Sequence, residues 1–175
     1  MPEEQRTFEQ LVLPHLKAGY NLARWILRND RDAEDVMQEA TLRAFRFLDG
    51  FSGSSPRAWL LSIVRNAAHS FLQQDRGRTL GTAFDEDRHA ATASAEQPPE
   101  TPEASLERKD RQRALNDAVL ALPVEFREVF VLRELEGFSY KEIAGIAAIP
   151  IGTVMSRLSR ARRQLQAAMG AGGAP

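Results

Sequence analysis

The segment between Thr153 and Arg163 carries the side chains with the clearest chemistry in the chain. Small hydroxyl residues are interspersed with arginines there, and four arginines and no acid follow Pro150. Arginine can donate two hydrogen bonds to a guanine edge or a phosphate, and serine permits close approach to DNA. The chemistry that this segment can perform is therefore nucleic-acid binding. The alternative is a solvated basic helix end, which the helix dipole also favours.

The same segment has the periodicity of an amphipathic helix. At about 100° per residue its apolar side chains gather on one face, and the serines and arginines lie opposite or on the flanks. The predicted DNA-contacting residues are Thr153, Ser156, Arg157, Ser159, Arg160 and Arg163.

The elements before this helix predict a helix-turn-helix. Ser139 and Glu142 have the spacing of a capping box that starts a short helix from Tyr140 to about residue 148. Residues 149–152 (Ile-Pro-Ile-Gly) then break it, with the glycine expected to supply the tight turn. Thr153 is expected to cap the longer second helix. A short helix, a tight turn and a long helix are typical of a DNA-binding motif.

Catalytic and metal-binding patterns are missing from the sequence. Cysteine is absent, and His15, His69 and His89 have no partner at metal-ligand spacing. The acids of residues 30–39 lack the glycine and terminal glutamate of a calcium loop. We therefore expect a protein that is not an enzyme, with no metal, no cofactor and no small-molecule substrate.

The N-terminal part of the chain also predicts helices. One apolar face recurs through residues 16–27, and a second helix is expected over about residues 33–48, with Asp32 as its N-cap. Residues 49–56 form a loop by composition, and Ser55-Pro56 marks the start of a third helix that reaches about residue 76.

Residues 76–105 differ in composition from their surroundings. They contain three bases and six acids, and Leu80 and Phe84 are their only large apolar residues. Such a segment buries too little surface to fold alone, so we expect a flexible acidic linker. The predicted architecture is all-α: a helical domain over residues 1–75, the linker, a helix-turn-helix domain over residues 106–169, and a disordered tail over residues 170–175.

Composition limits the class of protein. The 175 residues are 43% hydrophobic and 27% charged, and the net charge is −1. A folded core is therefore possible. The first residues, MPEEQR, precede no apolar stretch typical of a signal peptide, and no apolar run is long enough to span a membrane. We expect a cytoplasmic protein with no membrane insertion.

Motifs along most of the chain resemble those of one protein family. Residues 32–45 (DAEDVMQEATLRAF) are similar to the second conserved region of bacterial sigma factors, and residues 59–68 (WLLSIVRNAA) resemble the helix that follows it. Four further segments resemble the fourth region: residues 120–123, 126–130, 137–144 and 152–162. The combination, in this order and with a linker between, resembles the extracytoplasmic-function (ECF) sigma factors of bacterial RNA polymerase.

The resemblance implies partners and roles for particular residues. It implies binding to core RNA polymerase and to promoter DNA, with control by an anti-sigma factor. The helix over 33–48 would contact polymerase through Asp35, Gln38, Glu39, Arg43 and Arg46. The residues implied in −10 recognition and melting are Phe51, Ser52, Gly53, Ser54, Ser55, Arg65, Asn66, Ser70, Gln73, Gln74 and Arg76. The helix-turn-helix would read the −35 element.

Some positions depart from the family pattern. Ser70 stands where an aspartate is usual, residues 73–76 carry fewer bases than is common, and Met155 replaces a frequent basic residue. These departures bear on which promoter sequences are read. Two alternatives also remain open at this stage: a free-standing helix-turn-helix regulator that binds operators without polymerase, and a helical scaffold that binds only proteins.

Overall fold

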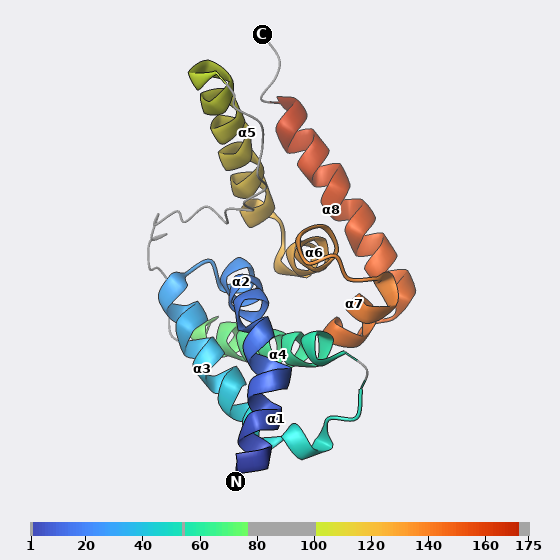
Figure 1. Cartoon of the computed structure of the whole chain (residues 1–175). Helices are drawn as coiled ribbons and strands as arrows, with labels where there is room; N and C mark the ends of the chain where they lie inside the picture. Colours follow the sequence, from blue (N-terminus) through green and yellow to red (C-terminus); the bar gives the residue numbers. More distant parts are fainter. Residues whose placement is uncertain (1, 54, 77–100, 172–175) are drawn as a thin grey trace.

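The computed structural model describes residues 2–53, 55–76 and 101–171, and all regular structure within these ranges is helical. This confirms the predicted all-α fold. Figure 1 shows two groups of helices, one from each half of the chain, stacked on one another.

The N-terminal domain is built from four helices and two single turns. Its elements are α1 (Pro2–Val12), the 3-10 turn η1 (Leu13–His15), α2 (Leu16–Leu27), α3 (Asp30–Arg46), the 3-10 turn η2 (Leu48–Gly50) and α4 (Pro56–Arg76). Helices α2, α3 and α4 all contact one another. Leu22, Val36 and Leu60, one from each helix, are among the residues buried between them. Burial of these apolar faces is what holds the three helices together.

Gly19 explains how closely the three helices approach. A Cβ added at this glycine would lie 3.1 Å from Cε of Met37 and 3.2 Å from Cγ2 of Val64. An added Cβ would therefore force the side chains of Met37 and Val64 to shift by a few tenths of an ångström, so glycine suits the close approach of α2 to α3 and α4.

The start of α3 differs from the prediction. The helix begins at Asp30, and Asn29 caps it by accepting a 2.9 Å hydrogen bond from the backbone N–H of Asp32. Asp32 is thus inside the first turn, where its negative charge suits the helix dipole. Ser55 does cap α4 as predicted, accepting a hydrogen bond from the N–H of Ala58 at 3.1 Å.

The C-terminal domain contains α5 (Pro102–Ala121), α6 (Val124–Phe130), a π-helical turn η3 (Val131–Leu135), α7 (Tyr140–Ala147) and α8 (Ile151–Ala171). Helix α5 begins at Pro102, inside the range predicted as linker, and Thr101 caps it. Helix α8 extends to Ala171, two residues into the predicted tail. Residues 77–100 and 172–175 lie outside the described residues.

The turn of the helix-turn-helix is built differently from the expectation. Ala148 takes the left-handed conformation, with φ of 54°, and its N–H closes α7 on the carbonyl of Ala144. Gly152 and Thr153 already belong to α8, so the predictions of a turn glycine and a Thr153 cap are wrong. The N–H groups of Thr153 and Val154 instead bond to the carbonyl of Pro150.

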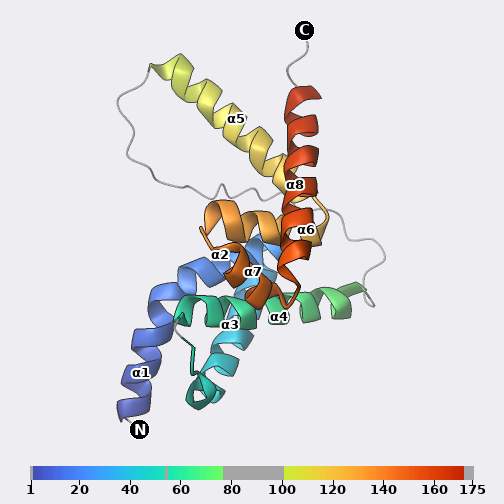
Figure 2. The ribbon, with the colours of Figure 1, turned by 90° about the vertical axis from the view of Figure 1, so that its right-hand side faces the viewer.

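The two domains pack against each other. Helix α4 contacts α7, and α2 contacts α6 and η3. Figure 2 shows α4 lying across the base of the C-terminal domain, while the far ends of α5 and α8 point away from the N-terminal domain. Buried residues of both domains form one continuous hydrophobic core.

Candidate DNA-binding and protein-binding surfaces

Helix α8 presents a polar face opposite its buried stripe. Val154, Leu158, Ala161 and Leu165 are buried, and the first three are almost inaccessible to solvent. Ser156, Ser159, Arg160 and Arg163 are exposed, while Thr153 and Arg157 are half-buried. The structure therefore brings the six predicted −35 residues onto one helix, with four of them exposed.

The arginines of α8 divide into two groups. Arg162 pairs with Glu134 of η3 at 2.7 Å, which ties this flank of the helix to the domain. Among the residues that the structure describes, Arg160 and Arg163 have no ion-pair partner. Their guanidinium groups can therefore reach phosphates or base edges without breaking an internal pair.

The capping box that positions the motif forms as predicted, with one difference in geometry. The Ser139 hydroxyl accepts from the N–H of Glu142 at 3.1 Å. The Glu142 carboxylate accepts from the Ser139 hydroxyl, also at 3.1 Å, and does not reach the backbone of Ser139. The short helix α7 is thereby fixed below α8.

The loop before α4 forms one wall of a cavity of about 400 Å³. Phe51 and Trp59 lie with ring centroids 5.1 Å apart, and Gly50, Ser52 and Gly53 continue the wall. Glu142, Gly145 and Ile146 of α7 form the opposite side. An aromatic pair beside small polar residues can stack a base and bond its edge. Ser54, also predicted here, lies outside the described residues.

The predicted −10 residues of α4 do not form one accessible surface. Asn66, Ser70, Gln73, Gln74 and Arg76 are exposed. Arg65, in contrast, turns to the C-terminal domain, where its Nε and Nη2 donate to the two carboxylate oxygens of Glu128, each at 3.1 Å. Arg65 is thus occupied by a protein partner in this arrangement.

Glu128 is the centre of an ionic cluster between the domains. Its carboxylate is fully buried and also lies 2.6 Å from Nε2 of His69. We call Arg65, His69 and Glu128 the interdomain cluster. A second link joins Arg57 of α4 to the carboxylate of Glu136 at 2.6 Å, with the Arg57 guanidinium 4.3 Å from the ring centre of Phe138.

Sequence reasoning missed Glu128 and the interdomain roles of Arg65 and His69. Glu128 stands between Arg127 and Val129 in a helix whose pattern gives no sign of a buried acid. Only the folded arrangement, which brings Glu128 of α6 to Arg65 and His69 of α4, identifies it, so no local signal could have found this contact.

The pKa of Glu128 makes this cluster sensitive to acid. Burial by itself raises the pKa, but hydrogen bonds from His69 and Arg65 outweigh it and hold the pKa below the ordinary 4.5. A lowered folded-state pKa means that the stabilisation is complete above the unfolded-state pKa and is lost as pH falls through the folded-state value.

We therefore expect acidification below about pH 4.5 to weaken the packing of the two domains. Small-angle X-ray scattering against pH, with helix content followed by circular dichroism, measures this as a rise in radius before helix content falls. The variant Glu107→Gln, which alters an exposed acid of α5, should show the same rise. A radius that stays constant until the helices melt would contradict the prediction.

Arg127 is a buried cation with a different role. Its Nη1 donates to the carbonyls of Leu120 and Leu122, at 2.9 and 3.0 Å, and its Nη2 donates to the carbonyl of Ile26 at 3.0 Å. Burial lowers its pKa to about 10, so it stays charged at neutral pH. It joins the ends of α5 and α2, where unpaired carbonyls carry partial negative charge.

The predicted polymerase-binding residues lie on α3. Asp35, Gln38, Glu39 and Arg46 are exposed, Arg43 is half-buried, and Arg43 pairs with Glu39 at 2.8 Å. The same end of α3 exposes Leu42, Phe45 and Phe47, with 55%, 49% and 63% of each residue accessible. This surface is therefore partly apolar, although the residues predicted to contact polymerase are all polar or charged.

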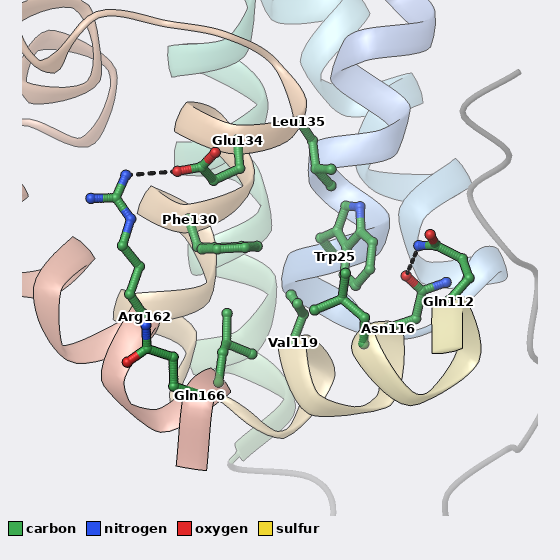
Figure 3. A pocket seen from close by; sticks show the side chains of 11 residues that line it. Trp25, Gln112, Asn116, Val119, Phe130, Glu134, Leu135, Arg162 and Gln166 are labelled. Carbon is green, nitrogen blue, oxygen red and sulfur yellow. Dashed lines mark hydrogen bonds and ion pairs between the residues drawn. The ribbon is translucent and has the colours of Figure 1, made fainter. Parts of the chain in front are cut away.

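A second cavity, of about 450 Å³, lies between α5, η3 and α8 of the C-terminal domain, and Trp25 of α2 also lines it. Figure 3 shows Trp25, Val119 and Phe130 lining it, with Leu135 at one side and the Arg162–Glu134 pair at another. Its lining is mostly apolar and contains no cluster of groups suited to acid–base or nucleophilic chemistry. Such a hollow suits an apolar side chain of a protein partner.

Two general searches complete the description of the surface. No cluster of three or more metal-ligating side chains occurs in the described part of the chain. None of the helices described is both long enough and apolar enough to cross a bilayer.

Comparison with known protein families finds two matches in separate halves of the chain. Residues 11–78 match the Sigma-70 region 2 family, and residues 112–165 match the Sigma-70, region 4 family. The first match ends two residues into the segment 77–100 that the structure does not describe, and the second begins after that segment.

Several curated proteins are similar over nearly the whole chain. The RNA polymerase sigma-H factor of Pseudomonas aeruginosa is 34% identical over 175 residues, covering 95% of this chain and 88% of that protein. The ECF RNA polymerase sigma-E factor of Escherichia coli is 32% identical, covering 93% and 86%. The ECF RNA polymerase sigma factor SigE of Mycolicibacterium smegmatis is 34% identical, but the chain spans only 60% of its length.

Two solved structures are similar in fold. The sigma factor RpoE in complex with the anti-sigma factor NepR, from Bartonella quintana, has a TM-score of 0.75 at 28% identity and covers 93% of this chain and 96% of its own. CnrH in complex with the cytosolic domain of CnrY has a TM-score of 0.63 at 27% identity, with 95% and 90% covered.

Proposed function

The chain belongs to the ECF sigma factors of RNA polymerase, and from this premise we propose that it binds the core enzyme, directs it to −35 and −10 promoter elements and assists promoter melting. The observation that carries the proposal is the joint presence of both sigma regions on one chain, with an exposed serine–arginine face on the helix-turn-helix. Any catalysis then belongs to the polymerase, and the site of action is the bacterial cytoplasm.

We assign −35 recognition to α8. Ser156, Ser159, Arg160 and Arg163 are accessible on the face opposite the core, where a groove-reading helix needs them. The assignment of the −10 element to the loop before α4 rests on its aromatic pair and its small polar residues.

The −10 surface requires a change of domain arrangement. In the packed form, α7 covers one side of the cavity beside Phe51 and Trp59, and Glu128 holds Arg65. Separation of the domains would uncover this cavity and release Arg65. It would also let α8 reach DNA at a distance from α4. Binding of core polymerase to surfaces of both domains would stabilise the separated form at the expense of the packed one.

Two kinds of protein partner fit the apolar surfaces. The exposed Leu42, Phe45 and Phe47 beside the charged face of α3 offer core polymerase a mixed interface. We also propose an anti-sigma factor, because the RpoE and CnrH structures were solved with NepR and with the cytosolic domain of CnrY. Such a partner would compete with polymerase for these surfaces.

Transcription in vitro tests the function directly. Purified core polymerase and a pool of promoter fragments would be incubated with and without the protein, and transcript start sites mapped. Protein-dependent initiation at fragments sharing one −35/−10 pair is the expected result. Specific DNA binding by the protein alone, without any stimulation of core polymerase, would favour the free-standing regulator instead.

Replacing Arg160 by alanine should weaken binding to promoter DNA by about 1–3 kcal/mol, because a bidentate contact to a base edge or phosphate is lost. Titration of holoenzyme onto the selected promoter, at fixed salt, measures the loss. Arg113→Ala removes the same charge from an exposed position on α5 and serves as the matched control. Equal promoter affinity for Arg160→Ala and the control would remove Arg160 from the recognition surface.

A further inference from the structure

Two large apolar side chains are exposed at the N-terminal end of α8. Ile151 is the first residue of the helix and is 41% accessible, and Met155 is one turn further on and 50% accessible. The other exposed residues of this half of the helix are glycine, serine and arginine. Exposed apolar surface on a polar helix face is a sign of a binding partner.

The core of the domain does not account for these two residues. Val154 and Leu158 supply the buried contacts of this part of α8 and have accessibilities of 0% and 1%. Ile151 and Met155 lie beside that stripe, on the flank that borders the serine face. At about 100° per residue, Met155 is only about 40° from Ser159 around the helix axis. An object that contacts Ser159 therefore also meets Met155.

Gly152 adds an independent observation. A Cβ built on this residue meets no atom within 4 Å, so packing inside the protein does not require a glycine here. Its φ is that of an ordinary helix residue, because Gly137 is the one described glycine with positive φ. The first turn of α8 thus carries no side chain between Ile151 and Thr153. That gap permits close approach of the helix backbone to the floor of a groove.

The chemistry of the major groove identifies what these residues would contact. N-terminal residues of a recognition helix are the ones that reach base edges. Among the four DNA bases, only thymine presents a methyl group in that groove, and apolar side chains read it by contact. Guanine, adenine and cytosine offer polar groups there, which methionine and isoleucine cannot satisfy.

We propose that Met155, supported by Ile151, is a specificity-determining residue that reads the 5-methyl group of a thymine in the −35 element. The inference rests on the proposed sigma function and adds the identity of one base, a thymine, in the −35 element. The arginines and serines of α8 then supply the polar contacts to neighbouring positions, and Gly152 sets the distance of the helix from the bases.

Replacing thymine by uracil removes only the 5-methyl group, and so tests whether that group is read. Each thymine of the selected −35 element would be replaced in turn by uracil, and the affinity of holoenzyme measured for the wild type and for Met155→Ala. Burial of one methyl group is worth about 0.8 kcal/mol, so the wild type should bind the uracil form about fourfold more weakly at one or two positions. Met155→Ala should bind the thymine and uracil forms equally at one of those positions.

A matched control lies on the same helix. Met169→Ala alters another exposed methionine near the C-terminal end of α8 and should keep the full preference for thymine. Because Met155 is exposed, its replacement should leave the helix content and the melting temperature unchanged, which circular dichroism checks.

Three outcomes would overturn the proposal. The first is that the wild type binds the uracil forms as tightly as the thymine form at every position. The second is that Met155→Ala keeps the preference for thymine. The third is that Met155→Ala loses a protein partner while it reads DNA normally. In each case initiation by the wild type with core polymerase would still support the proposed function. Failure of initiation itself would instead reject the sigma function.

Discussion

Arg127→Met is expected to lower the free energy of unfolding by about 3 kcal/mol, since three carbonyl groups in buried or partly buried hydrogen bonds lose their donor. The guanidinium of Arg127 donates to Leu120 and Leu122 at the end of α5 and to Ile26 near the end of α2. Methionine fills much of the space but donates no hydrogen bond. The desolvation cost of burying a charge is recovered in the variant, which keeps the expected loss below the sum of three charged hydrogen bonds.

Equilibrium unfolding in urea measures this loss as a shift of the midpoint. Arg111→Met is the matched control, because Arg111 is mostly exposed and, within the part of the chain that the structure describes, pairs with Glu107 one turn away at 3.7 Å. A change of less than about 0.5 kcal/mol is expected there. Arg127→Lys should lose nearly as much as Arg127→Met, because one ammonium group cannot reach three carbonyls arranged around a planar fork. If Arg127→Met were as stable as the control, the three hydrogen bonds would make no net contribution to the free energy of unfolding.

Local signals in the sequence predicted much of the helical framework. Ser55 and Ser139 act as N-caps where predicted, because capping depends on a side chain and a backbone N–H only a few residues apart. The buried stripe of α8 also follows from periodicity alone, since every member lies on one side of a regular helix.

The errors occurred where two local signals competed. Asn29 and Asp32 are both good capping residues, and the chain uses the earlier one. Gly152 was expected in the turn because glycine tolerates positive φ, yet Ala148 takes that conformation. The short α7 has to end there for Ile149 and Val154 to pack inward, so tertiary packing overrides the preference of a single residue.

The arrangement of the two domains could not be predicted from the sequence. The family resemblance implies a DNA-binding role for Arg65, and nothing nearby in the sequence indicates that it meets Glu128, 63 residues later. Contacts of this kind depend on which faces two domains present to each other, and no periodicity encodes that. The accessible residues of α8, by contrast, follow from one helix and its core.

Glu128→Gln tests what holds the packed arrangement together, and we expect it to separate the domains. The amide keeps the shape of the carboxylate but removes the negative charge that Arg65 and His69 face. Breaking a fully buried pair costs about 3–5 kcal/mol, and the partial exposure of Arg65 and His69, at 18% and 24%, reduces this to about 2 kcal/mol. A loss of that size multiplies the ratio of separated to packed forms by about 30.

Distance measurements can follow this change because the chain contains no cysteine. Glu34→Cys on α3 and Arg113→Cys on α5 place fluorescent labels at exposed positions on the two domains. Energy transfer between the labels should fall in Glu128→Gln and stay constant in the control Glu107→Gln, which changes an exposed acid on α5. Helix content should be the same in both variants, which separates domain opening from unfolding.

The same variant links the packed arrangement to DNA binding. With Arg65 released and the cavity beside Phe51 and Trp59 uncovered, Glu128→Gln should bind a single-stranded −10 oligonucleotide more tightly than the wild type in the absence of polymerase. The gain should be tenfold or more if packing hides this surface, since affinity scales with the fraction of competent molecules. With core polymerase present the two proteins should bind promoter DNA alike, because the polymerase already stabilises the separated form. Unchanged energy transfer together with unchanged oligonucleotide binding would mean that Glu128 does not control the −10 surface, and that other contacts between α4 and α7 hold the domains together.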